Sequence, residues 1–88
     1  MTTLNELFGK VEELIRRLTT VAERIEWLVR RLLQAKSKLE RLVGNHPPVQ
    51  LARVLEEMDK AEKRLGRNLV VIVVCVSSLE KWLQKARQ

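Results

Sequence analysis

The sequence is poor in the residues on which most small folds and active sites depend. Its 88 residues include one cysteine, one histidine, three glycines, two prolines and no tyrosine. The single cysteine, Cys75, excludes a disulfide scaffold. One cysteine and one histidine cannot complete a zinc site within one chain, because such sites take three or four side-chain ligands. No glycine-rich phosphate loop is present, so we expect neither a metal nor a cofactor.

The few candidates for catalysis have simpler structural explanations. His46 stands beside Pro47-Pro48, where a capping or surface role is expected. Cys75 falls within an apolar run, which predicts an inert core thiol, because reactive thiols need a positive and partly open setting. The remaining catalytic alternative is a deep polar pocket inside a bundle, formed by Arg24, Arg31, Glu62 and Asn68. We expect that the protein is not an enzyme.

The start of the chain carries no targeting pattern. Its first residues lack a basic stretch followed by an apolar run, so we expect no secretory signal and a cytoplasmic location. The longest apolar run covers residues 69–76. Eight helical residues span about 12 Å of a hydrocarbon core roughly 30 Å thick, so this run is too short to cross a membrane.

Apolar residues recur every seven positions over most of the chain. The first register is Leu4, Val11, Leu18, Ile25, Leu32 and Leu39, and the second is Leu7, Leu14, Val21, Leu28, Ala35 and Leu42. A matching seam follows at Leu51, Leu55, Met58, Leu65, Leu69, Ile72, Val76, Leu79, Leu83 and Ala86. Sustained heptads predict long helices that pack along coiled-coil seams.

Local signals predict where the helices begin and end. Thr3 and Glu6 form a capping box. Gly44 tolerates the backbone that closes a helix, and Pro47-Pro48 prevents its continuation. The sequence therefore predicts one domain over residues 1–88, with a helix at 3–43, a turn at 44–48 and a helix at 49–87. Each helix of about 40 residues is roughly 60 Å long, and matched arms favour an all-α antiparallel hairpin.

The turn also predicts which residues face one another. If residue 43 lies near residue 50, the numbers of facing residues sum to about 93. Trp27 then lies over Gly66, as a knob over a residue without a side chain. Glu62, the charged residue in the second seam, faces Arg31 in a partly buried ion pair. The alternative is that Glu62 lies at a solvated edge of the seam.

The apolar surface is wider than one hairpin covers. Residues 69–76 are apolar around the whole helix, and such a helix is buried on all sides. A strand is the competing interpretation, because Val and Ile favour sheets, but no second strand-like segment exists to pair with it. We expect oligomerisation, with a homodimeric four-helix bundle as the smallest solution. The expected interface comprises Trp27, Leu33, Leu69, Val70, Val71, Val73 and Val74.

The chain is basic, with 17 Lys and Arg against 11 Asp and Glu and a formal net charge of +6. Many acids have a basic residue four positions later, a spacing that pairs charges on a helix. These pairs are Glu12 with Arg16, Glu13 with Arg17, Glu26 with Arg30, Glu56 with Lys60 and Asp59 with Lys63. The surplus forms two columns at heptad spacing, Lys10, Arg17, Arg24, Arg31 and Lys38 in the first helix and Arg53, Lys60 and Arg67 in the second.

The basic columns have two interpretations. Such stripes neutralise phosphates, the main source of sequence-independent affinity for nucleic acid. Basic residues that flank a seam also pair across subunits or lay their stems over the core. No zinc-finger, basic-zipper or RNA-recognition signature is present, so the sequence leaves both interpretations open.

Three classes of function follow. The leading hypothesis is a non-enzymatic structural or adaptor protein that associates with itself, and with any second protein, through its apolar surfaces. The alternative is a small basic nucleic-acid-binding or packaging protein, in which self-association repeats the basic columns along the polymer. A peripheral membrane binder is disfavoured, because the seam competes for the same apolar face.

The layout of the chain resembles two families of helical hairpins. Leu42-Val43-Gly44 stands between two long predicted helices, and this resembles the WXG100 secreted hairpins, which carry Trp-x-Gly at the turn. Here Leu42 occupies the position of that Trp, and the chain is basic, whereas that family tends to be acidic. The architecture also resembles the helical-hairpin coat proteins of rod-shaped and filamentous viruses. The first resemblance implies a secreted hairpin and the second a coat-like assembly, and neither assigns a site residue.

Overall fold

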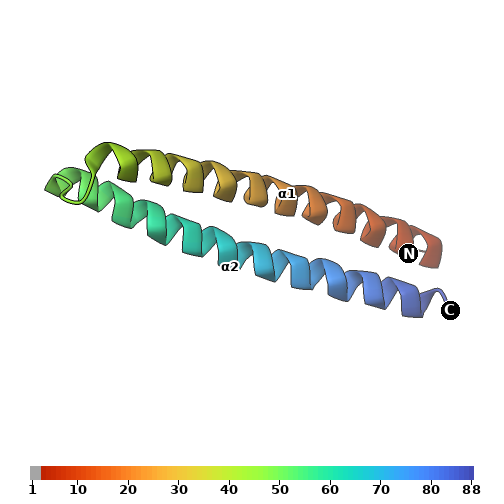
Figure 1. Cartoon of the computed structure of the whole chain (residues 1–88). Coiled ribbons are helices and arrows are strands. Elements are labelled where there is room, and N and C mark those ends of the chain that lie inside the picture. Colours follow the sequence, from red (N-terminus) through yellow and green to blue (C-terminus); the bar gives the residue numbers. More distant parts are fainter. Residues whose placement is uncertain (1–2) are drawn as a thin grey trace.

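The computed structural model describes residues 3–88 and contains two long helices, α1 (Leu4–Val43) and α2 (Val49–Ala86). They lie antiparallel, with both termini at one end and the turn at the other (Figure 1). The predicted all-α hairpin is confirmed, and residues 69–76 are helical rather than a strand. The molecule measures 62 × 21 × 14 Å. Its radius of gyration of 19.5 Å exceeds the roughly 12 Å of a compact chain of this length.

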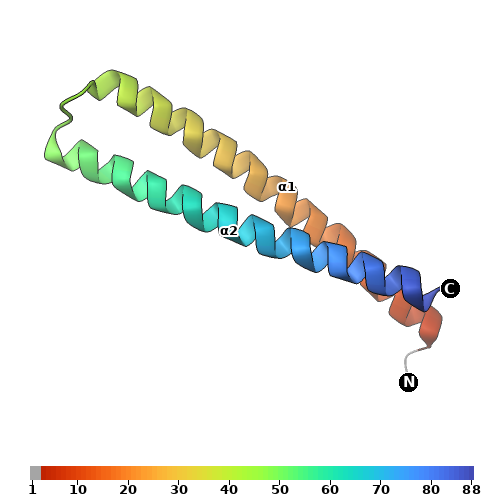
Figure 2. The same ribbon diagram turned by 60° about the horizontal axis from the view of Figure 1, so that its bottom comes forward.

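The ends of α1 carry the signals that the sequence predicts. The hydroxyl of Thr3 accepts a hydrogen bond from the backbone N–H of Glu6 at 3.2 Å. At the other end, the N–H of Gly44 donates to the carbonyl of Glu40 at 3.1 Å, and Gly44 has a φ of +67°. Figure 2 shows the short connection between the two helices, which ends at Pro48. Glycine and proline thus define the turn by backbone geometry.

The helices pack along two adjacent columns of side chains in each helix. In heptad notation, the a column of α1 is Phe8, Ile15, Ala22, Val29, Lys36 and Val43, and its d column is Val11, Leu18, Ile25, Leu32 and Leu39. In α2 the a column is Leu55, Glu62, Leu69, Val76 and Leu83, and the d column is Leu51, Met58, Leu65, Ile72 and Leu79. All of these residues are buried or half-buried, so they form the seam of the hairpin.

The second register predicted for α1 is wrong. The register that begins at Leu7 is exposed along its whole length, and the register that begins at Phe8 takes its place in the seam. The column from Val11 to Leu39 has an apolar neighbour on either side, so apolar periodicity alone fits both choices. Charged partners distinguish them. Lys36 in the a column reaches Asp59, and Glu12 beside that column reaches Arg87, whereas the exposed column contains no charged residue.

The best-packed part of the hairpin lies at its open end. Phe8, Val11 and Leu83 are buried there, with Ile15 and Leu79 against them. The ring of Trp82 meets Phe8 edge to face, with centroids 6.2 Å apart. The guanidinium of Arg87 lies 5.3 Å from the centroid of the Phe8 ring and forms an ion pair with Glu12. No large side chain among residues 3–88 is completely buried, so this shallow cluster is the core.

The predicted contact between Trp27 and Gly66 is absent. A Cβ atom added at Gly66 would have no other atom within 4 Å, and Trp27 is 58% exposed. Positions a and d of α1 face α2, and Trp27 occupies position f, which lies on the side of α1 that points away from α2. Gly66 therefore lies within the continuous helix α2 without accommodating a neighbouring side chain.

Replacing Phe8 by alanine should destabilise the protein by about 3–5 kcal/mol, because it removes the central side chain of the core. Thermal unfolding followed by circular dichroism measures this loss. Val49→Ala is the control, since Val49 is exposed and its change should stay within about 0.5 kcal/mol. Equal effects of the two substitutions would show that the open end is not the core.

Gly66→Ala should stabilise the protein by up to about 1 kcal/mol, because alanine has the higher helix propensity and open space is available. Gly44→Ala should have the opposite sign, because Gly44 has a φ of +67°, a backbone that costs other residues about 1–3 kcal/mol. Urea unfolding of both variants gives the two free energies of unfolding. A destabilised Gly66→Ala variant would mean that another chain packs closely at this position.

Candidate functional site

The structure leaves one apolar column of each helix outside the seam. In α1 this is the g column, Leu7, Leu14, Val21, Leu28, Ala35 and Leu42. In α2 it is Val54, Ala61, Asn68, Cys75 and Trp82, in which Asn68 is the polar exception. Two antiparallel helices are related by a two-fold axis perpendicular to the plane that contains them. The same heptad position of both helices therefore lies on the same face of the pair. The two columns together, without Asn68, are called the apolar face below.

The apolar face is continuous and open to solvent. Its leucines and valines in α1 are between 40% and 83% exposed. With Lys36 facing Asp59, the register brings Leu14 to the height of Trp82 and Val21 to the height of Cys75. Part of the face is a shallow groove between the helices, in which Leu32, Met58 and Ala61 are flanked by Arg53 and Glu57. One hairpin therefore carries an uncovered apolar strip along its length.

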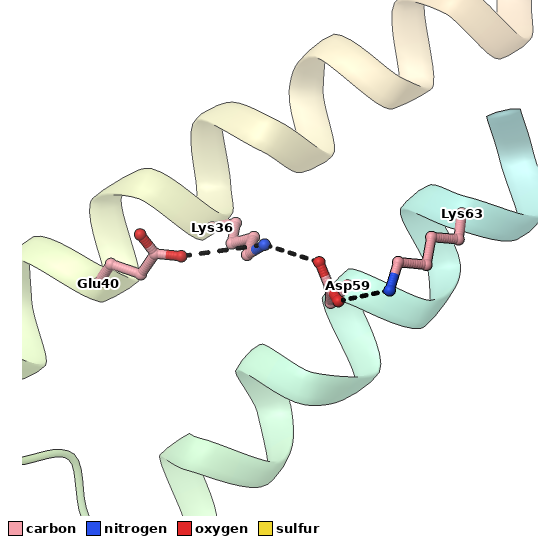
Figure 3. A network of polar contacts seen from close by, with 4 residues as sticks. All are labelled: Lys36, Glu40, Asp59 and Lys63. Carbon is pink, nitrogen blue, oxygen red and sulfur yellow. Dashed lines mark hydrogen bonds and ion pairs between the residues drawn. The ribbon is translucent and has the colours of Figure 1, made fainter.

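The opposite face of the hairpin carries six charged residues in its e columns, Glu12, Glu26 and Glu40 in α1 and Asp59, Glu80 and Arg87 in α2. Leu33 and Val73 lie in the same columns and are exposed. Figure 3 shows four charged side chains in a row across the two helices. Lys36 Nζ lies 2.9 Å from Asp59 Oδ1 and 4.0 Å from Glu40 Oε1, and Lys63 Nζ lies 3.3 Å from Asp59 Oδ2. This charged face closes the seam on the side away from the apolar face.

The contact between Lys36 and Asp59 shifts both groups toward their charged forms. Its hydrogen bond is the main cause that raises the pKa of Lys36 above its ordinary value, with partial burial acting against it and the charges of Asp59, Glu40 and Glu62 adding to it. The same hydrogen bond is the main cause that lowers the pKa of Asp59, followed by the hydrogen bond from Lys63. The pair therefore helps to fix the register of the two helices. Because it lies at a half-exposed edge, its contribution to the free energy of unfolding is modest.

The structure does not bring Arg31 and Glu62 together. Glu62 lies in the seam close enough to Lys36 to raise the pKa of its amine. Arg31 instead places its guanidinium 5.4 Å from the centroid of the Trp27 ring. Lys36 is the residue that the sequence analysis missed, although a signal existed, since it is the one charged residue in its column.

The first basic column lies beside the apolar face. We call its residues, Lys10, Arg17, Arg24, Arg31 and Lys38, the basic stripe, and all of them are exposed. Within the described residues, Arg17 pairs with Glu13 at 2.7 Å, whereas Lys10, Arg24 and Lys38 form no ion pair. Shallow hollows at its two halves have both basic and apolar walls, as where Arg24 adjoins Val21. The stripe thus borders the apolar face without belonging to the hairpin seam.

The second basic column, Arg53, Lys60 and Arg67, is exposed on the outer side of α2. Two predicted pairs within helices are formed, Glu13 with Arg17 and Asp59 with Lys63. Two other residues take different partners, since Glu12 pairs with Arg87 and Lys60 with Glu57 at 3.3 Å.

The residues expected at an oligomer interface lie on several sides of the hairpin. Trp27, Leu33, Val70, Val71, Val73 and Val74 are exposed, and Leu69 is half-buried in the a column of α2. Val71 adjoins Cys75 one helical turn away, next to the apolar face. The hairpin by itself does not bury the thiol of Cys75, which is exposed. The sequence indicated apolar excess, but it did not indicate which surface carries most of it.

The polar pocket considered for catalysis is not assembled. Arg24 and Arg31 border separate shallow hollows on α1, and Glu62 lies near Lys36. In the part of the chain that the structure describes, no three His, Cys, Asp or Glu side chains are grouped to hold a metal ion. Over the same residues, neither helix has a stretch long and apolar enough to cross a membrane.

No protein-family model, curated protein or solved structure matches this chain.

The ion pair between Lys36 and Asp59 predicts a pH dependence of stability. Because folding lowers the pKa of Asp59, the pair stabilises above the ordinary carboxyl value of 3.8 and loses its contribution as the pH falls through the lowered value. The raised pKa of Lys36 keeps the contribution intact up to the ordinary amine value of 10.5. At neutral pH the wild type should therefore have a higher melting temperature than Asp59→Asn, and this difference should shrink when the pH is lowered below 3.8.

Thermal melts between neutral and strongly acidic pH measure this difference. Glu23→Gln is the matched control, because it removes one carboxylate from an exposed position of α1. A gap between wild type and Asp59→Asn that does not change with pH would rule out a contribution from the ion pair.

Proposed function

We propose that the protein is a non-catalytic self-assembling module in which two hairpins join through their apolar faces into a four-helix bundle. The observation that carries this proposal is the exposed g column of α1, which is apolar at all six of its positions. Helices with apolar a, d and g positions are typical of bundles, whereas a two-helix seam needs only a and d. A second copy supplies an equally apolar surface of equal length.

The exposed area supports a partner of this size. The chain exposes 7261 Å², whereas a compact protein of 10.3 kDa exposes about 5,400 Å². A compact dimer exposes about 8,900 Å², so its formation from two hairpins buries up to about 5,600 Å² in total. An elongated bundle buries less than this bound, yet obligate homodimers need only about 2,000 Å². The hairpin therefore has enough uncovered surface for a stable dimer.

The composition of the apolar face also favours burial. It contains no charged residue, so pairing two copies leaves no charge without water at its centre. The polar exception beside it is Asn68, which is uncharged. The charged e columns and the basic stripe lie at the margins, where side chains keep their solvent.

The adaptor function rests on the apolar residues that this dimer leaves outside. Val70, Val73 and Val74 of α2 are more than half exposed and lie on other sides of that helix. We propose that they contact a second protein. The valines thus remain contact residues, as the sequence predicts, and the apolar face forms the contact between the two hairpins.

The double variant Leu14→Glu and Leu28→Glu should halve the mass measured by light scattering, from about twice 10.3 kDa to 10.3 kDa. Both residues are exposed in the single hairpin, so their charge repels only a second copy. The matched control is Val70→Glu with Val74→Glu, which adds the same charge to α2 and should leave a dimer intact.

Loss of the dimer in the control but not in the first variant would transfer the interface to the valines of α2. An unchanged dimer mass in both variants would exclude both surfaces as the interface, and a monomeric wild type at high protein concentration would refute self-assembly. The same measurement at high salt should leave the wild-type mass unchanged, because burial of apolar area is not screened by ions.

A further inference from the structure

Trp27 is not explained by the seam or by the proposed dimer. It occupies heptad position f of α1, the position farthest from α2, and it is 58% exposed. The apolar face lies on a different side of the helix, so a bundle formed through that face leaves Trp27 outside. The chain has only two tryptophans, and the other one, Trp82, packs against Phe8.

The surroundings of Trp27 are cationic. On a helix, residues three and four positions away are the surface neighbours of a side chain. For Trp27 these are Glu23, Arg24, Arg30 and Arg31, so three of the four are arginines. The guanidinium of Arg31 lies 5.4 Å from the centre of the indole ring, and neither Arg24 nor Arg30 forms an ion pair within residues 3–88. The ring therefore lies beside the middle of the basic stripe.

An exposed aromatic ring within a row of arginines matches the chemistry of single-stranded nucleic acid. Such strands bind through bases that stack on aromatic side chains and through phosphates that are neutralised by basic ones. From Lys10 to Lys38 the basic stripe runs about 42 Å along one helix at 1.5 Å per residue. We propose that the outer surface of α1 binds single-stranded nucleic acid, with a base stacked on Trp27 and phosphates held by Arg24, Arg31 and their neighbours in the stripe.

Two other anionic partners fit these observations less well. A duplex keeps its bases stacked on one another, so it offers phosphates to the stripe but no base to Trp27. An anionic membrane needs apolar residues next to the ring for insertion, whereas the surface neighbours of Trp27 are charged. The proposal does not rest on self-assembly, because position f is accessible in one hairpin as well as in a bundle.

The fluorescence of Trp27 tests this proposal directly. In a Trp82→Phe background Trp27 is the only tryptophan, and titration with an oligothymidylate of about 15 nucleotides at low salt should quench its emission by stacking. Trp27→Ala should weaken binding, measured by anisotropy of a labelled strand, by about 5- to 150-fold. Trp27→Phe should retain most of the affinity, because phenylalanine also stacks.

Two triple variants with equal loss of charge locate the phosphate contacts. Replacing Arg17, Arg24 and Arg31 by glutamine should reduce the slope of log affinity against log salt by about 2. Replacing Arg53, Lys60 and Arg67 by glutamine should change that slope little, since these residues lie on α2. Circular dichroism of each variant should match wild type, because all the changed side chains are exposed.

Several results would overturn the proposal. Binding without quenching, equal binding of a duplex of the same length, or equal effects of the two triple variants would indicate diffuse attraction between a basic protein and any polyanion. Quenching or a blue shift with vesicles of anionic phospholipid, but none with the oligonucleotide, would assign Trp27 to a membrane surface. The test is repeated with Leu14→Ser and Leu28→Ser, which removes apolar side chains from the dimer face without adding a carboxylate beside Arg24 and Arg31, so that a failure of dimerisation is not mistaken for a failure of binding.

Discussion

The d column of α1, from Val11 to Leu39, is the constraint on which the rest of the structure depends. It has an apolar column on either side, and a single partner helix covers the d column together with only one of them. The hairpin covers the column that begins at Phe8. Every other surface follows from this choice, because it leaves the g column in solvent, directs Glu12 and Lys36 toward α2 and turns Trp27 outward.

Electrostatics and packing together determine which column is covered. Apolar burial is nonspecific, and either neighbouring column supplies it. Lys36 and Glu12 find Asp59 and Arg87 only when the column of Phe8 faces α2. Half-exposed ion pairs contribute little free energy each, but they discriminate between two packings of similar apolar area. The aromatic cluster around Phe8 then closes the open end, where the helices have no covalent connection.

The sequence predicted the helices and their limits well, because capping, helix termination and heptad spacing are local properties. The hydroxyl of Thr3 and the positive φ of Gly44 are where the sequence placed them. It failed where two interpretations had the same periodicity. The exposed register from Leu7 to Leu42 follows from an incorrect choice of phase in α1. The exposed thiol of Cys75 reflects the apolar run of α2, which is wider than one partner helix covers. Lys36 is the one charged residue in its column, but the sequence alone does not indicate that its partner is Asp59, which lies outside the seam columns of α2.

The sequence by itself determined two long amphipathic helices, their turn and an excess of apolar and basic surface. These depend on residues within a few positions of one another along the chain. Only the tertiary structure decided which apolar columns meet, which remain in solvent, and on which side of them the basic stripe and Trp27 lie. The physical reason is that a helix with three apolar columns has two nearly equivalent ways to face a partner. Contacts between residues distant in sequence, such as Lys36 with Asp59, select one of them.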